Sequence, residues 1–163
     1  MTLPAGFGVR PALPTDAGTL ARFRAAMFND FGVEPEEDWE TFWTAYFQAA
    51  LTDGRYWALL AEDRGVSVAC AGLMLFPVVP VPSDVSGLRA HVQGVYTELE
   101  YRGRGLGETL TRAVLKEAQT RGLKSANLNA SVMGRGVYER LGFTESNWPE
   151  MRLVLEQLAP ART

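Results

Sequence analysis

The sequence predicts an α/β fold in which helices cover both faces of one mixed, mostly antiparallel sheet. Two strand-like apolar runs, 56–62 and 67–76, are joined by a short turn, and a helical apolar period follows at 106–121. Shorter strand-like runs continue beyond that helix. At 163 residues the chain has the size of one domain with a substantial core, so a single domain over 1–163 is expected.

The N-terminal third is expected to hold a short strand near 8–10 and then two helices. Prolines near both helix starts suit the first helical turn, which predicts helices over about 14–28 and 35–51. The residues 63–66, Asp-Arg-Gly-Val, have turn chemistry. They predict that the two apolar runs form a β-hairpin.

The second half alternates strands and helices. The stretch 77–87 contains too many prolines for a paired central strand, so it is expected to be a loop. A strand over 91–97 follows, and then the helix over 106–121, whose apolar residues recur with a 3.6-residue period. The remaining expected elements are a strand over 124–129, a short helix over 135–140, and strands over 143–145 and 151–155.

Composition excludes several classes of function. The formal net charge is -3 and the arginines are scattered, which argues against a nucleic-acid-binding surface. No targeting segment or membrane span is visible, so a soluble cytoplasmic protein is expected. The single cysteine, Cys70, lies in an apolar run and is expected to be a small buried side chain rather than a nucleophile.

The most informative motif is Arg102-Gly103-Arg104-Gly105-Leu106-Gly107, between the expected strand 91–97 and the start of the next helix. Free backbone N–H groups and the positive end of the helix dipole meet there and favour a pyrophosphate. Glycines let a ligand approach the backbone, and the two arginines add charged donors. The spacing fits neither the dinucleotide fingerprint nor the P-loop. The motif therefore predicts another kind of polyphosphate site.

The spacing Arg-x-x-Gly-x-Gly of Arg102, Gly105 and Gly107 resembles the acyl-coenzyme A signature of the GCN5-related N-acetyltransferase (GNAT) superfamily. Three further segments resemble the family in its order along the chain, and they are 9–17, 128–131 and 137–143. The resemblance runs from about residue 8 to the end. It implies the GNAT fold, with a splay between the fourth and fifth strands.

The resemblance also implies an activity. A GNAT enzyme transfers an acetyl group from acetyl-coenzyme A directly to a primary amine, here of a small molecule or a peptide, and needs no metal. A homodimer is compatible with such a domain. The alternative is a non-catalytic module that binds or senses acyl-coenzyme A.

Three side chains are candidates for proton transfer. By resemblance, Tyr138 lies beside the thioester sulfur and protonates the leaving thiolate; alternatively it is a core tyrosine. His91 starts the expected strand 91–97, where family members place a base, and the ordinary histidine pKa suits that role; alternatively it is an exposed strand-end residue. Glu98 is the second candidate base; alternatively it is a solvated acid beside a basic turn.

Further contacts with the coenzyme are implied by resemblance. Backbone N–H groups around Val95, Tyr96 and Thr97 would hold the oxyanion, and the same edge would accept the pantetheine arm.

Two positions depart from the family pattern. Ser131 stands where many members carry an asparagine, so Asn129 is the substitute to consider, and Leu99 stands where proline is usual.

Overall fold

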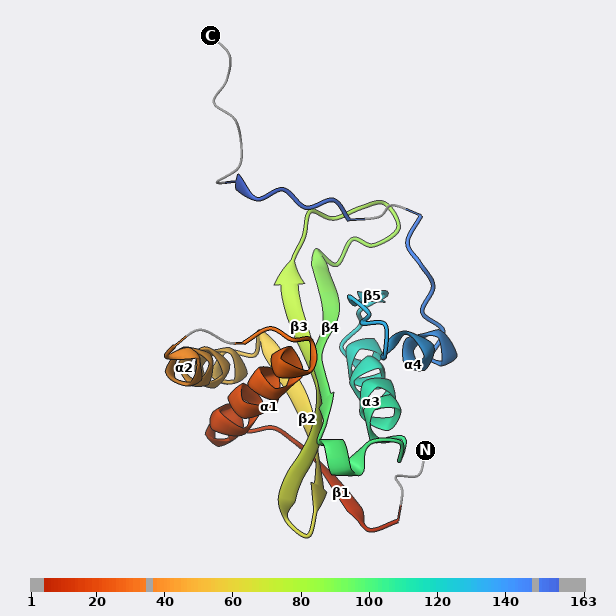
Figure 1. The fold of residues 1–163 in the computed structure, drawn as a ribbon. Helices are drawn as coiled ribbons and strands as arrows, with labels where there is room; N and C mark the ends of the chain where they lie inside the picture. The colour runs from red at the N-terminus through yellow and green to blue at the C-terminus, as the bar shows by residue number, and fades with distance from the viewer. Residues whose placement is uncertain (1–4, 35–36, 148–149, 156–163) are drawn as a thin grey trace.

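A computed structural model of the chain describes residues 5–34, 37–147 and 150–155. Its strands form one sheet in the order β1-β2-β3-β4-β5 (Figure 1). Neighbours are antiparallel from β1 to β4, and β5 runs parallel to β4. Helices α1 and α2 cover one face, and α3 and α4 lie on the other (Figure 1). The predicted fold class is therefore confirmed.

The elements and their bounds, with η for 3-10 helices, are as follows in chain order: β1 (Phe7–Pro11), η1 (Pro14–Asp16), α1 (Ala17–Asp30), α2 (Trp39–Thr52), β2 (Tyr56–Asp63), β3 (Val66–Pro77), β4 (Leu88–Thr97), η2 (Leu99–Tyr101), α3 (Leu106–Thr120), β5 (Ala126–Asn127) and α4 (Arg135–Arg140). The first expected helix thus opens as a 3-10 turn. The second begins at residue 39, and positions 35–36 of its expected start lie outside the described residues. In the described ranges no helix is both long and apolar enough to cross a membrane.

The predicted β2–β3 hairpin is confirmed. Its two turn residues, Arg64 and Gly65, have φ of 51° and 82°, so both adopt the left-handed conformation. Two such residues in a two-residue loop make the turn whose twist matches antiparallel strands. The expected proline-rich loop also forms, over 78–87 between β3 and β4.

Two apolar clusters pack on the two faces of the sheet. On the α3 face, Leu106, Leu110 and Val114 are buried against Ala90 and Val92 of β4. On the other face, buried side chains of α1 and α2 pack on β2, β3 and the end of β4. Because side chains alternate along a strand, the residue between Ala90 and Val92 faces the α1 and α2 side.

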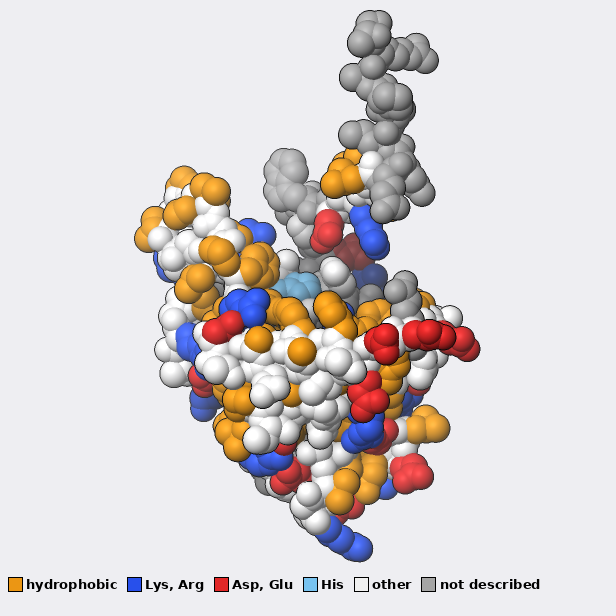
Figure 2. All heavy atoms as spheres, turned by 90° about the vertical axis from the view of Figure 1, so that its left-hand side faces the viewer, with side chains coloured by type: hydrophobic (Ala, Val, Ile, Leu, Met, Phe, Trp, Pro, Cys, Tyr) orange, Lys and Arg blue, Asp and Glu red, His pale blue; other side chains and the backbone are white. Residues whose placement is uncertain are grey.

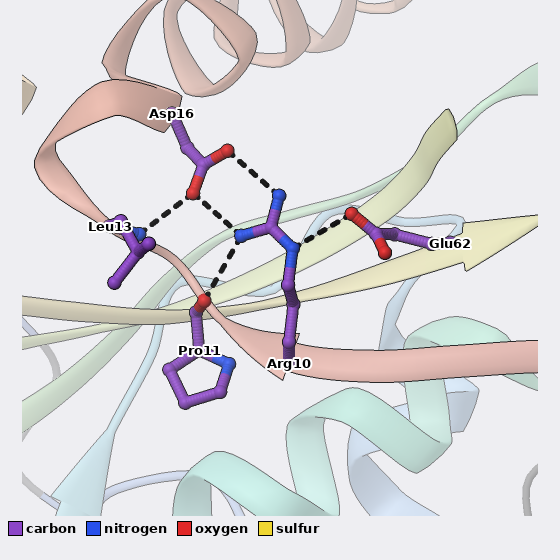
Figure 3. A network of polar contacts seen from close by, with 5 residues as sticks. All are labelled: Arg10, Pro11, Leu13, Asp16 and Glu62. Carbon is purple, nitrogen blue, oxygen red and sulfur yellow. Dashed lines mark hydrogen bonds and ion pairs between the residues drawn. The ribbon is translucent and has the colours of Figure 1, made fainter. Parts of the chain in front are cut away.

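One polar network stabilises the turn that leads from β1 into α1 (Figure 3). Arg10 of β1 donates to both carboxylate oxygens of Asp16 at 2.7 and 2.9 Å and to Glu62 of β2 at 2.8 Å. Asp16 also accepts from the backbone N–H of Leu13 at 2.7 Å. The Arg10 guanidinium lowers the pKa of the Asp16 carboxyl. The network thereby ties the first turn before α1 to the sheet edge.

The predicted splay beside β4 is confirmed. Pairing between β3 and β4 shifts register between Cys70 and Gly72, and Gly94 in the bulge has φ of 63°, which favours glycine. Strand β4 pairs with β5 only at Ala90 and His91. Beyond these pairs, the side of β4 toward β5 has no partner strand among the described residues.

The C-terminal strands were predicted wrongly. The strand expected over 124–129 is reduced to Ala126–Asn127, and residues 143–145 and 151–155 form no strand. Residues 151–155 are mostly apolar, but a strand also needs a neighbour to pair with. In the structure this segment leads away from β5 (Figure 1).

Candidate functional site

The glycine-rich turn, residues 102–107, leads from the end of β4 into α3. Gly103 and Gly105 have φ of 75° and 78°, and an added Cβ at either would have nothing within 4 Å. The first helical hydrogen bond runs from Thr109 N to Gly105 O at 3.0 Å. The N–H groups of Leu106 and Gly107 therefore have no acceptor inside the helix, and no side chain caps it. The turn therefore presents open backbone donors at the start of α3, and anion binding there stays a prediction.

A cavity of about 430 Å³ opens in front of this turn. It brings together the glycine-rich turn, the end of β4 at Val95, Tyr96 and Thr97, and two residues from the C-terminal part, Ser131 and Tyr138. These segments lie far apart in the sequence. The structure thus gathers most of the predicted coenzyme-contacting residues around one space.

The two arginines of the turn contact protein groups. Arg102 donates from Nε to Thr97 O at 2.9 Å and from Nη2 to the carboxylate of Asp30 in α1. Arg104 donates to Glu100 O at 3.1 Å, with its guanidinium 5.1 Å from the ring centroid of Tyr101. Both side chains therefore shape the turn, and the backbone N–H groups are its open donors.

A third arginine, Arg140, lines the cavity, although the sequence analysis did not single it out. It binds Glu108 of α3 at 3.0 Å, and this contact lowers the pKa of the Glu108 carboxyl. The local sequence held no signal for it, because the pair joins two helices 32 positions apart.

Tyr138 lies in α4 with its ring against neighbours. Phe143 meets the ring edge-on at 6.0 Å, and a Cβ at position 134 would lie 3.0 Å from a ring carbon, so Gly134 is needed for this packing. In the described part of the chain the hydroxyl makes no hydrogen bond. Burial raises the pKa of Tyr138. The side chain is thus a neutral O–H donor at the cavity wall.

His91 lies outside this cavity, on the face of β4 that α1 and α2 cover. Figure 2 shows the imidazole at the surface, between apolar side chains. Its Nδ1 lies 3.0 Å from Oδ1 of Asn127 in β5. An amide oxygen only accepts, so Nδ1 is the donor in this contact, and in the neutral ring Nε2 is then the nitrogen that carries the lone pair. Asn127 was missed by the sequence analysis, because only the parallel register of β4 and β5 brings the two residues together.

Glu98, the second candidate base, is already engaged. Its Oε1 accepts from the guanidinium of Arg22 in α1, and its Oε2 accepts from the hydroxyl of Tyr96 at 3.1 Å. Burial raises the pKa of Tyr96, and the Glu98 carboxylate with its hydrogen bond raises it further. Glu98 therefore joins the end of β4 to α1.

The residues that depart from the family pattern are also placed. The Oγ of Ser131 accepts from Gly134 N at 3.1 Å and the residue lines the main cavity. Asn129 is exposed and lines a separate groove beside β5. Leu99 opens η2 and is 74% exposed, so this turn forms without proline.

Cys70 is buried, as predicted. Its Sγ donates to Gly94 O at 3.0 Å, and burial raises the pKa of the thiol to about 12. It therefore stays protonated at neutral pH and packs against the bulge. Within the described residues, no group of three or more His, Cys, Asp or Glu side chains could hold a metal ion.

Comparison of the sequence with known proteins finds relatives in the family that the motifs resemble. A sequence model of the Acetyltransferase (GNAT) family matches residues 24–143. The chain is also similar to Glucosamine 6-phosphate N-acetyltransferase 1 of Oryza sativa subsp. japonica. The two are 27% identical over 135 residues, which cover 82% of this chain and 81% of the relative.

Solved structures are similar over nearly the whole fold. A predicted acetyltransferase with acetyl-CoA from Clostridium acetobutylicum aligns with a TM-score of 0.84 and 28% identity, covering 93% of this chain and 98% of that one. A GCN5-related N-acetyltransferase from Ralstonia eutropha JMP134 aligns with a TM-score of 0.78 and 27% identity, covering 91% and 99%.

Proposed function

The chain belongs to the acetyltransferase (GNAT) family, and we propose that it transfers an acetyl group from acetyl-coenzyme A directly to a primary amine of a small molecule or peptide. One observation carries the proposal. The open N–H groups of the glycine-rich turn, the unpaired end of β4 and the Tyr138 hydroxyl all border the same cavity. That combination supplies an anion site, an extended edge and a proton donor in one place.

The residues of the cavity fit coenzyme A. The N–H groups of Leu106 and Gly107 lie at the positive end of the α3 dipole and suit a pyrophosphate. The unpaired side of β4 at Val95–Thr97 suits the extended, amide-bearing pantetheine arm, which would add to the sheet as a strand does. When bound, acetyl-coenzyme A supplies the acetyl group as a thioester.

Two groups of the protein would then act on the donor side. Backbone N–H groups at Val95–Thr97 stabilise the negative charge that develops on the carbonyl oxygen. The Tyr138 hydroxyl donates its proton to the departing sulfur, and solvent restores it. Its raised pKa keeps this proton in place at neutral pH.

On the acceptor side, His91 is the base that we propose. Asn127 contacts Nδ1, so in the neutral ring Nε2 would take a proton from an ammonium group, directly or through water. Glu98 is less suited, because both of its oxygens are bound to Arg22 and Tyr96. The acceptor would approach from the face of the sheet that α1 and α2 cover.

A free-thiol assay with acetyl-coenzyme A and a panel of amines tests the proposal. The panel contains a phosphorylated amino sugar, since the rice relative is named for one, together with a diamine and a short peptide. We expect coenzyme A and acetylated amine in equal amounts with at least one acceptor. If acetyl-coenzyme A binds but no amine in the panel causes release of free coenzyme A thiol, the result would instead indicate the non-catalytic module.

A further inference from the structure

Tyr56 of β2 has a buried ring and a hydroxyl without a protein partner. The residue is 2% exposed, and within the described ranges its Oη makes no hydrogen bond. Every fully buried side-chain oxygen or nitrogen of the described residues does have a partner. The small exposed area of Tyr56 therefore includes the hydroxyl oxygen. A phenylalanine ring would fill the same apolar space, so core packing does not account for this hydroxyl.

Two glycines make room for the Tyr56 side chain. An added Cβ at Gly72 of β3 would lie 1.7 Å from Tyr56 Oη and 2.2 Å from Cζ, although the φ of Gly72 does not require glycine. An added Cβ at Gly94 of β4 would lie 3.0 Å from the same oxygen. The ring therefore passes over β3 at Gly72 and ends beside Gly94, in the bulge of β4. The next residue along β4 is Val95, the first of the three at the proposed oxyanion site.

The hydroxyl lies on the same side of the sheet as His91. Tyr56 belongs to the apolar cluster beneath α1 and α2. It pairs with Met74 of β3, and Met74 pairs with His91 of β4. Directly paired residues point to the same side of a sheet. The Tyr56 hydroxyl and the His91 imidazole, which Figure 2 shows at the surface, therefore face the side from which the acceptor would approach.

Gln93 adds another polar group to this side of the sheet. It pairs with Gly72, the residue that the Tyr56 ring covers, so the Gln93 side chain points the same way. The residue is half-buried, and its amide makes no hydrogen bond in the part of the chain that the structure describes. A hydroxyl and an amide can each donate and accept. Two such groups beside a proposed acceptor site have hydrogen-bonding capacity that a ligand can satisfy.

We propose that Tyr56 and Gln93 bind the acceptor through a hydroxyl group on the carbon next to the amine-bearing carbon. A hydroxyl both donates and accepts, so it can pair with Tyr56 Oη and with either end of the Gln93 amide at once. A methyl group in its place would leave both protein groups unpaired. The inference rests on the proposed acetyl transfer and narrows its acceptor to amines with a vicinal hydroxyl.

The spacing along β4 suits such an acceptor. His91 and Gln93 are two positions apart on a strand, which separates them by ~7 Å. An amine and its vicinal hydroxyl span this distance when each makes one hydrogen bond to the protein. Burial raises the pKa of Tyr56, so its hydroxyl stays protonated and can donate at neutral pH. Tyr56 and Gln93 are positioning residues in this arrangement, and His91 remains the proposed base.

Two matched pairs of amines test the inference by the free-thiol assay. They are 2-aminoethanol with propylamine, and trans-2-aminocyclohexanol with cyclohexylamine. The second member of each pair lacks the vicinal hydroxyl. In at least one pair, Tyr56→Phe should lower kcat/KM for the amino alcohol ~10-fold and change it less than ~2-fold for the plain amine. Each amine is compared between wild type and variant, so differences in amine basicity cancel.

Gln93→Leu should show the same selective loss. Its matched control is Gln119→Leu, because Gln119 is exposed on α3, on the opposite side of the sheet. This control should leave kcat/KM unchanged for every amine. Calorimetric titration should give a wild-type Kd for coenzyme A in all three variants. Tyr56→Phe should melt no lower than wild type, because the hydroxyl has no protein partner among the described residues.

Three results would overturn this inference and leave the proposed function standing. One is a Tyr56→Phe variant that treats both members of each pair alike. Another is a wild type that acetylates other amines but neither amino alcohol. The third is a greater loss in Tyr56→Phe for glycinamide than for the amino alcohols, which would assign the contact to a carbonyl group. Transfer to no amine at all would contradict the proposed function and this inference together.

Discussion

The coenzyme side and the acceptor side of the proposed site use different kinds of chemical groups. On the coenzyme side, the donors are backbone N–H groups of one short segment at the start of α3. On the acceptor side, His91 and Asn127 are side chains from two strands, oriented by each other at 3.0 Å. The first arrangement depends on main-chain conformation and tolerates changes of side chain. The second depends on individual side chains, so single substitutions should have specific effects there.

Helix α1 is held to the coenzyme side of the site. Its Arg22 binds Glu98 and its Asp30 binds Arg102, so two ion pairs of opposite polarity hold α1 to the end of β4 and the following turn. All four side chains are between 29% and 54% exposed, and pairs at such exposure contribute at most about 1 kcal/mol each. They are better understood as positioning contacts than as a source of stability.

The largest effect is expected at Tyr138. Tyr138→Phe keeps the ring packing and removes a hydroxyl that has no protein partner in the described residues. We expect kcat to fall roughly 10- to 1000-fold with little change in melting temperature. Because burial raises the pKa of Tyr138, the alkaline decline of the wild-type kcat should begin only above the ordinary tyrosine pKa.

The control for Tyr138 is Tyr46→Phe, a tyrosine of α2 outside the cavity. An unchanged kcat in Tyr138→Phe would return this tyrosine to a purely structural role.

His91 should give the next effect. His91→Ala is expected to lower kcat/KM roughly 10- to 100-fold and to flatten the rise of kcat/KM with pH, because a base must be unprotonated to act. Asn127→Ala should lower kcat/KM less, because it keeps His91 and removes only the contact that orients the imidazole ring. Comparing two acceptor amines of different pKa separates this rise of kcat/KM with pH from deprotonation of the acceptor itself. A limb that survives in His91→Ala would shift attention to Glu98.

A smaller effect on coenzyme binding is expected at Asp30. Its carboxylate lines the main cavity and holds Arg102. Asp30→Asn removes a negative charge near the pyrophosphate site and releases the arginine, so the Kd for coenzyme A should fall about 2- to 5-fold. Calorimetric titration measures it. Weaker binding would instead mean that the ion pair is needed to hold the turn in shape.

The smallest effect is on stability and lies outside the site. Asp16→Asn removes the partner of Arg10 and should lower the melting temperature at pH 7 by roughly 2–6 °C. The folded-state pKa of Asp16 is lowered, so its contribution is present above the ordinary carboxyl pKa and is lost as pH falls through the folded value.

The gap in melting temperature between wild type and Asp16→Asn should therefore close as pH falls below the ordinary carboxyl pKa and through the lowered folded-state pKa. The control is Asp53→Asn, at an exposed local pair with Arg55, and it should stay within ~1 °C of wild type. A gap that persists at low pH would show that the carboxylate charge is not its cause.

The same contrast explains what could be predicted from the sequence. The turn at Gly103–Gly107 and the hairpin at Arg64–Gly65 were predictable, because φ requirements and helix termini are local properties. The buried stripe of α3 was predictable for the same reason. By contrast, the contacts of Arg102 with Asp30, 72 positions apart, and of His91 with Asn127 depend on how strands and helices meet.

The C-terminal strands failed for a related reason. Residues 151–155 were predicted to form a strand from their apolar content, but an apolar run does not supply a neighbouring strand. Residue-level roles of Tyr138, His91 and Glu98 stay predictions, since their protonation and substrate contacts are matters for kinetics.

The central claim is that backbone N–H groups at the start of α3 bind the coenzyme, and position 107 tests it most directly. An added Cβ there would meet only Thr97 Oγ1 and Val95 Cγ1, each at 3.7 Å, so both Gly107→Ala and Gly107→Asp should fold. An acid in the first helical turn even favours the helix, while it repels a pyrophosphate. Calorimetric titration with coenzyme A should find Gly107→Ala close to wild type and Gly107→Asp weaker by ~100-fold or more. Equal affinity in the two variants would contradict the account.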